Sequence, residues 1–289
     1  MKKKMSWLCI FMVMTVMLTG CVAVKVTQEE MKTEGTEAAP AQGLTQTPDS
    51  EEAPTPKPTP TPEPEMTLGE TTMIDLSKGQ PENFEKANGW CNGDPFNVTW
   101  RGDNVTFEES RMQLIIDADE TPSNGVPYSG GEFRSKEFYG YGRYEVSMKA
   151  IKNDGVVSSF FTYTGPSDNN PWDEIDIEIL GKNTEKVQFN YYTNGRGNHE
   201  YMYELGFDAA EDFHTYAFEW YQNKILWYVD GEHVHTAIVN IPVTEGKIMM
   251  NAWCGKGVDS WLKAFDDTKM PLAAEYQWFS YTPFIYGEE

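Results

Sequence analysis

The sequence predicts an all-β fold, an antiparallel β-sandwich, for residues 66–289. Apolar and polar residues alternate with a period of two in several segments, among them residues 142–150, 187–192 and 224–229. Such alternation is typical of strands that bury one face. The last segment is followed by Asp230-Gly231, which favours a tight hairpin turn. No sustained helical stripe occurs, and only residues 259–265 suggest a short helix or turn, so we expect a sandwich of short strands.

Residues 1–20 have the organisation of a secretory signal peptide. Lys2, Lys3 and Lys4 precede an apolar run at residues 7–18, which is shorter than the roughly 20 residues that a membrane-spanning helix needs. The run leads into Leu-Thr-Gly-Cys21, which resembles the signal of bacterial lipoproteins, where cleavage precedes a cysteine that is then lipidated. We therefore expect an extracellular, cell-surface lipoprotein that carries lipid on Cys21. An ordinary signal peptide followed by a chance cysteine is the alternative.

Residues 21–65 are predicted to form a disordered, Pro/Thr-rich tether. Residues 54–64 read PTPKPTPTPEP, with proline at every second position. Proline fixes φ and lacks the backbone N–H that helices and sheets require, so this segment should be extended and semi-rigid. We assign it no catalytic role, and the predicted domain begins at residue 66.

The net charge argues against nucleic acid as a partner. Asp and Glu number 45 against 23 Lys and Arg, which gives a net charge of −22. Nucleic-acid binding depends on basic residues that neutralise phosphates. The acidic surplus is compatible with a neutral polymer as substrate. We expect a monomer that contacts a membrane only through its lipid anchor.

Two of the four cysteines fall within the predicted domain. Cys9 lies in the signal peptide and Cys21 at the lipidation site, which leaves Cys91 and Cys254. Two cysteines in an exported protein can form one disulfide, but the sequence cannot show that they meet. Buried free thiols are the alternative.

A row of carboxylates lies in the segment WDEIDIEILG, residues 172–181. Alternate side chains of a strand share a face, so Glu174, Asp176 and Glu178 point one way and the three isoleucines between and after them point into the core. Carboxylates are depleted in strands, and like charges on one face repel. The row therefore suggests catalysis. An acidic solvent-facing surface is one alternative, and a calcium site is another, although such sites usually lie in loops.

The spacing of the two glutamates favours a retaining glycosidase. Four residues of strand span about 13 Å, and side chains that lean toward each other leave roughly 5–6 Å between the carboxyl groups. Retaining enzymes have a separation of roughly 5–5.5 Å, and inverting enzymes need a wider one. Asp176 lies between the glutamates, so it couples to both titrations and helps to keep one ionised and the other protonated.

Aromatic and amide side chains recur on the same faces of the predicted strands. Sugar rings present apolar faces, so glycan-binding clefts combine aromatic rings with hydrogen-bonding groups. Trp172 shares a face with Glu174. Three further pairs share a face, namely Phe161 with Tyr163, Asn190 with Tyr192, and Asn251 with Trp253. Together these pairs make the acidic strand a candidate glycan-cleaving site.

Six short motifs carry a family resemblance. They are FFTYTG at 160–165, PWDEIDIE at 171–178, QFNYYTNG at 188–195, HTYAF at 214–218, WYVDG at 227–231 and GKIMMN at 246–251. In these motifs, and in order over nearly all of residues 75–282, the sequence closely resembles bacterial lichenases. Lichenases are the endo-β-1,3-1,4-glucanases of glycoside hydrolase family 16.

The resemblance implies a jelly-roll β-sandwich of the concanavalin-like type, with a substrate cleft across a concave sheet. It implies Glu174 as nucleophile, Asp176 as assisting carboxylate and Glu178 as general acid/base. The implied reaction is retaining hydrolysis of β-1,4 bonds adjacent to β-1,3 linkages in mixed-linkage β-glucans such as lichenan and cereal β-glucan, with no cofactor required. The matching cleft positions are Asn92, Glu132, Arg134, Phe161, Tyr163, Trp172, Asn190, Tyr192, Asn251 and Trp253.

The sequence departs from the family pattern at two structural features. Many members have a disulfide between the positions that are Val98 and Gly130 here, so that bridge is absent. Cys91 and Cys254 adjoin cleft positions whose segments should approach each other, and a relocated disulfide between them is one hypothesis. Members also often bind a structural calcium through an aspartate where this chain has Gln277. An amide oxygen is a poorer, uncharged ligand, which argues against this calcium.

Three rival functions fit parts of the pattern. β-1,3-Glucanases of the same family share the two glutamates but commonly have Glu-x-Asp-x-x-Glu, so the uninterrupted spacing here favours a lichenase. A non-catalytic glycan-binding module would keep the aromatic residues without needing all three carboxylates. A transglycosylase remains chemically open, because retention permits acceptors other than water.

Overall fold

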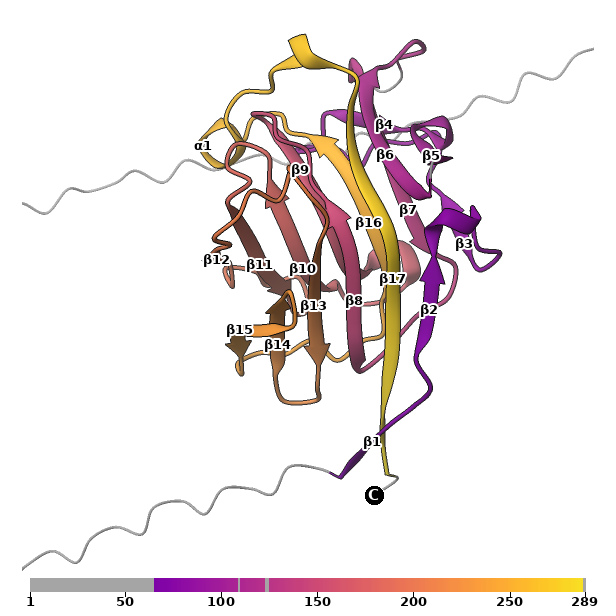
Figure 1. Ribbon diagram of the computed structural model, residues 1–289, viewed down its shortest axis with the longest axis vertical. Coiled ribbons are helices and arrows are strands. Elements are labelled where there is room, and N and C mark those ends of the chain that lie inside the picture. The colour runs from indigo at the N-terminus through magenta and orange to yellow at the C-terminus, as the bar shows by residue number, and fades with distance from the viewer. Residues whose placement is uncertain (1–64, 109, 123–124, 288–289) are drawn as a thin grey trace, which may run out of the picture. The chain divides into compact units, whose positions relative to one another are not determined.

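The alternating segments form strands that build two antiparallel sheets, stacked as two layers (Figure 1). The computed structural model describes residues 65–108, 110–122 and 125–287. The predicted signal peptide, the lipidation site at Cys21 and the tether up to residue 64 lie outside the described residues. Within the described part, no helix combines the length and the apolar character needed to cross a membrane.

The first sheet carries the acidic segment near its middle. Each of its strands pairs antiparallel with its neighbours. In spatial order the strands are β3 (Phe84–Lys86), β7 (Tyr128–Ser135), β16 (Lys247–Cys254), β9 (Val156–Thr164), β10 (Asp173–Leu180), β11 (Lys186–Tyr192) and β12 (Tyr201–Glu204).

The second sheet packs behind the first and is also antiparallel. In spatial order its strands are β5 (Val105–Glu108), β6 (Arg111–Ala118), β17 (Leu272–Tyr286), β8 (Gly142–Lys149), β13 (His214–Trp220), β14 (Ile225–Val229) and β15 (Glu232–Ala237).

The remaining elements are short and lie at the margins of the sheets. β1 (Met66–Leu68) and β2 (Thr72–Asp75) pair with β17, and β4 (Val98–Trp100) runs parallel to β7. The helical turns are η1 (Leu76–Lys78), η2 (Gly102–Asn104), η3 (Pro166–Asp168), α1 (Asp259–Leu262) and η4 (Asp267–Lys269).

The predicted hairpin turn and the predicted short helix or turn are both confirmed. Asp230 and Gly231 connect β14 to β15 with φ values of 48° and 82°, the left-handed region that aspartate and glycine tolerate best. The short helix α1 falls within residues 259–265. The arrangement of strands confirms the predicted all-β sandwich.

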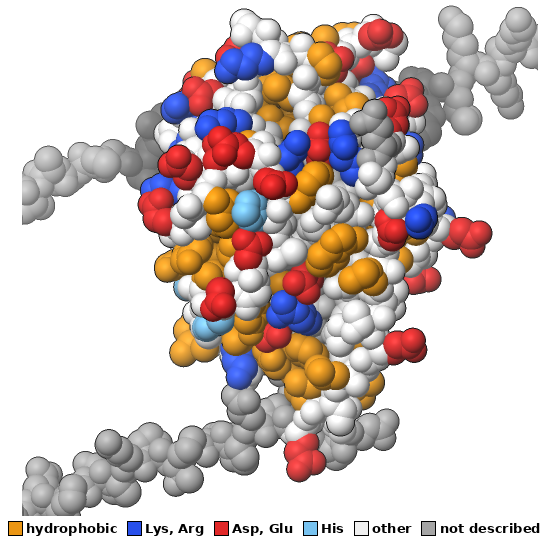
Figure 2. Space-filling view, in the orientation of Figure 1, with side chains coloured by type: hydrophobic (Ala, Val, Ile, Leu, Met, Phe, Trp, Pro, Cys, Tyr) orange, Lys and Arg blue, Asp and Glu red, His pale blue; other side chains and the backbone are white. Residues whose placement is uncertain are grey.

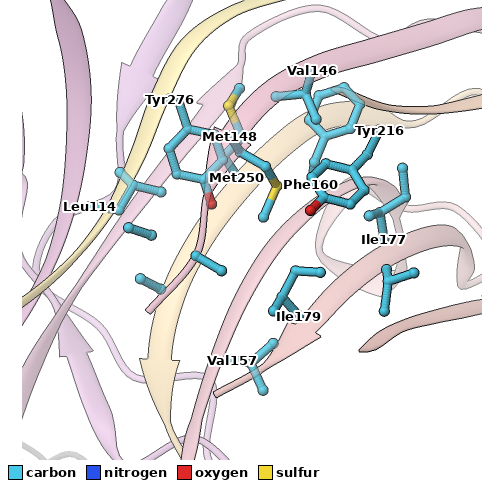
Figure 3. Packing of buried hydrophobic residues seen from close by; sticks show 14 of the residues in the cluster. Leu114, Val146, Met148, Val157, Phe160, Ile177, Ile179, Tyr216, Met250 and Tyr276 are labelled. Atoms are coloured by element: carbon cyan, nitrogen blue, oxygen red, sulfur yellow. The ribbon is translucent and has the colours of Figure 1, made fainter. Parts of the chain in front are cut away.

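The core lies between the two sheets and follows from the alternation of the strands. The three isoleucines of β10, at positions 175, 177 and 179, are fully buried. Figure 3 shows how residues of the two layers meet in this core. Its labelled members from the first sheet are Val157, Phe160, Ile177, Ile179 and Met250, and those from the second sheet are Leu114, Val146, Met148, Tyr216 and Tyr276.

Two hydrogen bonds cross the core and fix the first sheet to the second. The Tyr276 hydroxyl donates to the Ser159 carbonyl of β9 at 2.9 Å. The Trp227 indole donates to the Asp176 carbonyl at 3.2 Å. Buried donors are costly to leave unpaired, so these bonds hold the sheets in one relative position. The second bond acts directly on the strand that carries the carboxylates.

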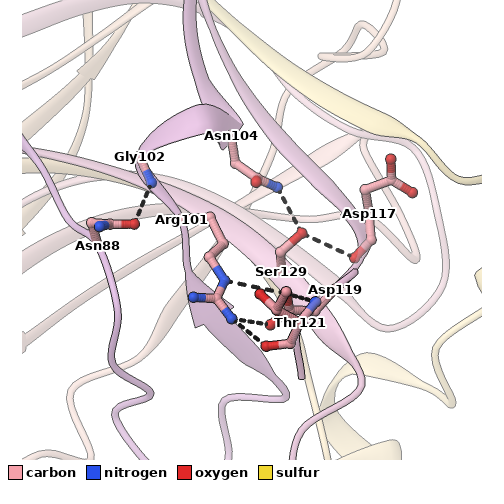
Figure 4. Close-up of polar contacts among 8 residues, drawn as sticks. All are labelled: Asn88, Arg101, Gly102, Asn104, Asp117, Asp119, Thr121 and Ser129. Carbon is pink, nitrogen blue, oxygen red and sulfur yellow. Dashed lines mark hydrogen bonds and ion pairs between the residues drawn. The ribbon is translucent and has the colours of Figure 1, made fainter. Parts of the chain in front are cut away.

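A polar network holds the corner where β4, β6 and β7 meet (Figure 4). The Arg101 guanidinium binds both carboxylate oxygens of Asp119, at 3.2 and 2.8 Å, and the Thr121 carbonyl at 2.6 Å. Asn104 donates to the Ser129 hydroxyl at 3.0 Å. Two-point contacts of this kind fix orientation as well as adding energy. The network therefore anchors one end of the first sheet.

The positions of the absent family disulfide adjoin this corner. A Cβ atom on Gly130 would lie 2.8 Å from the Ala252 carbonyl oxygen and 2.9 Å from a Val98 methyl group. Val98 itself is fully buried. Apolar packing therefore occupies the place that the resemblance assigns to a disulfide.

Of the two hypotheses for Cys91 and Cys254, the disulfide is wrong and the free thiols are observed, although only Cys254 is buried. The expected approach of their segments does occur, since the Asn97 N–H donates to the Cys254 carbonyl at 2.9 Å. Each thiol instead contacts a backbone carbonyl, Cys91 that of Phe96 at 3.6 Å and Cys254 that of Asn97 at 3.7 Å. Burial also raises the pKa of the Cys254 thiol to about 12, which keeps it protonated.

Replacing Arg101 with methionine should destabilise the fold in a pH-dependent way. Burial of Asp119 favours its neutral form, but the hydrogen bonds from Arg101, the Thr121 N–H and Thr99, together with the charge of Arg101, outweigh this and hold the pKa of Asp119 below its ordinary value. The ion pair therefore stabilises the fold above the unfolded-state pKa, and this contribution is lost as the pH falls through the folded-state pKa. We expect a loss of about 1–2 kcal/mol at pH 7 and a smaller loss at pH 3, measured by urea denaturation.

Lys78→Met is the matched control for this prediction. Lys78 pairs with Asp75 at 3.7 Å, but the two side chains are 80% and 50% exposed. Exposed pairs contribute little, so this variant should unfold like the parent. An equal loss for Arg101→Met at pH 7 and pH 3 would show that the charge of Asp119 is not the cause.

Candidate active site

β10 presents Glu174, Asp176 and Glu178 together on one face because its other face is fixed in the core. It lies between β9 and β11, paired with both along most of its length. Its isoleucines are buried between the sheets and the Asp176 carbonyl is bound by Trp227. Any one-residue slip would turn the isoleucines to solvent. The register therefore keeps Glu174, Asp176 and Glu178 on the outer face of the first sheet.

The strand register arranges the outer face of the first sheet in three rows. Directly opposite residues on neighbouring strands share a face. Each row contains one carboxylate of β10 and extends to both sides of it. The rows are Lys247–Tyr163–Glu174–Tyr192, then Arg134–Met249–Phe161–Asp176–Asn190, and then Glu132–Asn251–Ser159–Glu178–Gln188–Met202.

A cleft lies over these rows and has two parts. The larger part has a volume of about 730 Å³ and the smaller part about 410 Å³. Glu174, Asp176 and Glu178 line both parts, as do Trp172 and Trp253. The carboxylates therefore lie where the two parts meet, with binding surface on either side.

Each glutamate has one carboxylate oxygen held by a neutral donor. The Trp172 indole N–H donates to Glu174 Oε2 at 2.5 Å. The Gln188 amide donates to Glu178 Oε2 at 2.7 Å. Such bonds lock the rotamers of two side chains that would otherwise repel each other and turn toward water.

Burial raises the pKa of all three carboxyl groups. It raises the pKa of Glu174 to about 7, although hydrogen bonds from Trp172 and Asp176 act against the rise. It raises the pKa of Glu178 to about 8, with Gln188 opposing. The pKa of Asp176 lies well above its usual range through burial and the two flanking glutamates. A neutral Asp176 can thus donate to Glu174, so that one glutamate is ionised while the other keeps its proton near neutral pH.

The acids of the second sheet have a different environment. On the viewed face of the molecule, acidic and basic side chains lie next to one another (Figure 2). Arg143 pairs with Glu145 at 3.4 Å and with Glu219 at 3.1 Å. By contrast, none of Glu174, Asp176 and Glu178 has an ion-pair partner in the described part of the chain. A glutamate that is ionised there is therefore not neutralised by a neighbouring side chain and can act on a substrate.

The walls of the cleft offer aromatic faces and hydrogen-bonding groups. Trp172 stacks on Tyr192 with ring centroids 4.5 Å apart. Arg134 lies over the Trp90 ring at 4.8 Å and binds Glu85 at 2.9 Å. This combination suits the apolar faces and hydroxyl rims of sugar rings.

The structure brings every predicted catalytic and substrate-binding residue into this cleft, although their individual roles stay predictions. The larger part is lined by Asn92, Glu132, Arg134, Phe161, Tyr163, Trp172, Asn251 and Trp253. The smaller part is lined by Trp172, Asn190, Tyr192 and Trp253. One polar atom there is unsatisfied: the buried Asn190 Oδ1 has no hydrogen-bond partner among the described residues.

Several lining residues were not predicted. Ser159, Met249 and Gln188 each lie two residues from a predicted site residue on the same strand, so extending the alternation would have found them. Trp261 on α1 and Glu200 before β12 had no such signal, because a short helix and a loop have no period to extend.

The residues at the position of the family calcium do not fit that ion. Gln277 lies at an irregularity in the pairing of β17 with β8, and its Oε1 accepts a hydrogen bond from the Ser147 hydroxyl at 3.0 Å. Its oxygen is therefore uncharged and already engaged. Across the described ranges, no group of three or more His, Cys, Asp or Glu residues is placed to hold a metal. Calcium binding normally uses several oxygens, with carboxylates among them.

Glu178→Gln should stabilise the fold above neutral pH. Free glutamate titrates near 4.3, whereas burial raises the pKa of Glu178 to about 8. Between these values the folded state binds more protons than the unfolded state, so stability falls as the pH rises. Glutamine does not titrate, and its oxygen can still accept from Gln188. We expect the variant to exceed the parent by about 1–3 kcal/mol at pH 8 and to match it at pH 4, by urea denaturation.

The exposed Glu70 supplies the control for this measurement. Glu70→Gln should leave the difference between pH 4 and pH 8 unchanged. A parent protein as stable as Glu178→Gln at pH 8 would contradict the raised pKa.

Comparison with known proteins agrees with this geometry. The model of the family described as Glycosyl hydrolases family 16 matches residues 92–278. The chain is 57% identical over 220 residues to the xylanase/beta-glucanase of Ruminococcus flavefaciens, covering 75% of this chain and 27% of that protein. It is 58% identical over 208 residues to the beta-glucanase of Acetivibrio thermocellus, covering 72% of this chain and 61% of that protein. The chain thus spans less than two thirds of either relative.

A solved structure gives the same result over a whole domain. A prokaryotic beta-1,3-1,4-glucanase (lichenase) derived from a mouse hindgut metagenome superposes with a TM-score of 0.71 at 54% identity, covering 74% of this chain and 99% of that one. The chain therefore belongs to the glycosyl hydrolases of family 16.

Proposed function

We propose that the domain is a retaining endo-β-1,3-1,4-glucanase, which hydrolyses β-1,4 bonds adjacent to β-1,3 linkages in mixed-linkage β-glucans. The observation that carries this proposal is the placement of Glu174 and Glu178 on one face of one strand, at the junction of two parts of a cleft. Their backbone separation of about 13 Å allows the carboxyl groups to approach to the distance that retention requires.

In the first step Glu174 attacks the anomeric carbon as the glycosidic bond breaks. The proton of Glu178 passes to the departing oxygen, so that the leaving sugar departs as a neutral alcohol. Glu174 must be ionised for this attack. A neutral Asp176 supports ionisation by donating a hydrogen bond to Glu174, and Trp172 donates a second.

In the second step water releases the sugar from Glu174. Glu178, now a carboxylate, takes a proton from the water, which attacks the anomeric carbon and breaks the ester bond. Two inversions give net retention. The raised pKa of Glu178, about 8, suits a group that must donate a proton and then recover it near neutral pH.

A cleft that continues on both sides of the carboxylates supports attack within a polymer rather than at its end. The aromatic pair Trp172 and Tyr192 offers a flat apolar surface. The unpartnered Asn190 Oδ1 offers an acceptor for a sugar hydroxyl. The uninterrupted Glu-x-Asp-x-Glu spacing, together with the 54% identity to a solved beta-1,3-1,4-glucanase, favours a lichenase over a β-1,3-glucanase.

We further propose that the protein acts at the cell surface, held by lipid on Cys21. The lysines and apolar run before Leu-Thr-Gly-Cys21 and the Pro/Thr-rich segment after it support this. In bacteria fed a radiolabelled or alkyne-tagged palmitate, the parent chain should acquire label in the membrane fraction. Cys21→Ser should lose the label and appear in the medium. Labelling of both chains, or of neither, would refute lipidation at Cys21.

Glu174→Gln should abolish hydrolysis while leaving the fold intact. We expect the full chain to release reducing sugar rapidly from barley β-glucan and slowly or not at all from laminarin and carboxymethyl cellulose. The variant should lose at least about 10³-fold in kcat, because glutamine cannot form the covalent intermediate. Preference for laminarin would move the function to β-1,3-glucanase, and no release from any polymer would favour a binding module.

Azide rescue assigns the two glutamates separately. In Glu174→Ala, azide should take the place of the missing nucleophile and give an α-glycosyl azide from an activated aryl β-glycoside. In Glu178→Ala, azide should capture the covalent intermediate and give the β-anomer. Products of the opposite anomeric form would exchange the two roles.

A further inference from the structure

Two hydrogen-bonded side chains, Gln188 and Trp261, reach the acid/base candidate Glu178 from outside its own strand. Gln188 lies directly opposite Glu178 in the pairing of β10 with β11, and its Nε2 donates to Glu178 Oε2 at 2.7 Å. The Gln188 Oε1 accepts from the Trp261 indole N–H at 3.1 Å. Gln188 is only 5% exposed, so water has little access to its amide.

The indole determines which way the amide of Gln188 faces. An indole N–H can donate a hydrogen bond but cannot accept one, whereas an amide has a donor end and an acceptor end. Only the amide oxygen can therefore face Trp261. In the flipped orientation two donors would face each other, and a part-buried N–H would lose its partner, which is unfavourable. The NH₂ end of Gln188 is thus directed at Glu178.

The amide in turn determines where Glu178 can carry its proton. The carbonyl oxygen of a neutral carboxyl group is a stronger acceptor than its hydroxyl oxygen, so the hydrogen bond from Gln188 favours Oε2 as the unprotonated oxygen. The proton then resides on Oε1. With the amide flipped, Gln188 would accept a hydrogen bond from a proton on Oε2, and that proton would be held away from the substrate.

We infer that Trp261 and Gln188 are positioning residues that select Oε1 of Glu178 as the oxygen bearing the transferable proton. This inference rests on the proposed role of Glu178 as general acid. In the bond-breaking step the Oε1 proton passes to the glycosidic oxygen, which receives the electron pair of the broken bond. Glu178 is left as a carboxylate, whose Oε2 keeps its hydrogen bond from Gln188.

The position of Trp261 is itself fixed. Its helix α1 is tied to the start of β9, because the Gly155 N–H donates to the Leu262 carbonyl at 2.8 Å. Leu262 is fully buried, and the Trp261 ring lies against Trp253 with centroids 6.0 Å apart. The indole is therefore held by contacts that do not involve the substrate.

The other groups around Glu178 do not make this selection. Its titratable neighbours are Glu174 and Asp176 on the same strand and Glu200 from the loop before β12. All three are acidic and affect how strongly Glu178 holds a proton. The neighbour on β9 is Ser159, whose hydroxyl donates to Asn251. Gln188 is the neighbour that donates a hydrogen bond to one particular oxygen.

The test compares two substrates that differ in their need for a proton. Barley β-glucan has a sugar alkoxide as leaving group and requires protonation. A 2,4-dinitrophenyl glycoside of a mixed-linkage glucan oligosaccharide has a stable phenolate as leaving group and does not. Trp261→Phe keeps an aromatic ring but lacks the N–H. We expect it to lower kcat/KM for barley β-glucan by about tenfold and to change that for the aryl glycoside by less than about twofold.

Two further variants complete the design. Gln188→Met removes both hydrogen bonds at nearly constant volume and should show the same selective loss, even if Trp261→Phe fails to fold. Leu262→Met alters the packing of the same helix but keeps the indole N–H, so any effect should be equal for the two substrates. Retained melting temperatures would exclude a general loss of fold.

Equal losses on the two substrates for both Trp261→Phe and Gln188→Met would overturn the inference, since packing or binding would then explain them. No loss on barley β-glucan would overturn it as well. A parent protein that hydrolyses neither substrate would instead refute the proposed function, and with it the role of Glu178 on which the inference rests.

Discussion

The packing of one face of β10 into the core is the constraint on which the rest of the site depends. Ile175, Ile177 and Ile179 are fully buried between the sheets, and this burial outweighs the repulsion among three carboxyl groups on the opposite face. The Trp227 indole adds a directional bond to the backbone of the same strand. The carboxylates therefore keep their spacing without an ion-pair partner among the described residues. Their burial costs free energy, and it also raises the pKa values of Glu174 and Glu178 into the range where proton transfer is useful.

At both glutamates a tryptophan indole donates a hydrogen bond, and an indole N–H cannot act as an acceptor. Trp172 binds Glu174 directly, and Trp261 acts on Glu178 through the amide of Gln188. A hydroxyl or an imidazole in these positions could exchange donor and acceptor roles during the reaction. An indole N–H can only donate. Each glutamate therefore has one oxygen that keeps its hydrogen bond, while its other oxygen can take part in the reaction. At both glutamates, therefore, the orientation of the hydrogen bond depends on a tryptophan, although the two tryptophans belong to different elements of the fold.

Alternation in the sequence predicted much of the fold and part of the site. It paired Phe161 with Tyr163 and Asn190 with Tyr192 on shared strand faces, because alternate residues of a strand point the same way. Asn92 and Glu132 came from the resemblance. Asn92 lies in a loop, and Glu132 lies on β7, whose place in the sheet depends on pairing with strands far away in the sequence. Trp261 was missed because a four-residue helix has no repeat that could show its direction. The disulfide prediction was wrong because two segments can touch while their side chains point at backbone carbonyls.

The two free thiols differ in a way that makes the cleft accessible to spectroscopy. Cys254 is fully buried, whereas Cys91 is partly exposed and directly precedes Asn92, which lines the cleft. Maleimide reagents react with accessible thiols, so in the folded domain they should attach at position 91 and spare position 254. A dye placed there would sit at the rim of the cleft without any engineered cysteine. Its emission would then report the arrival of a polysaccharide chain, independently of whether any bond is cut.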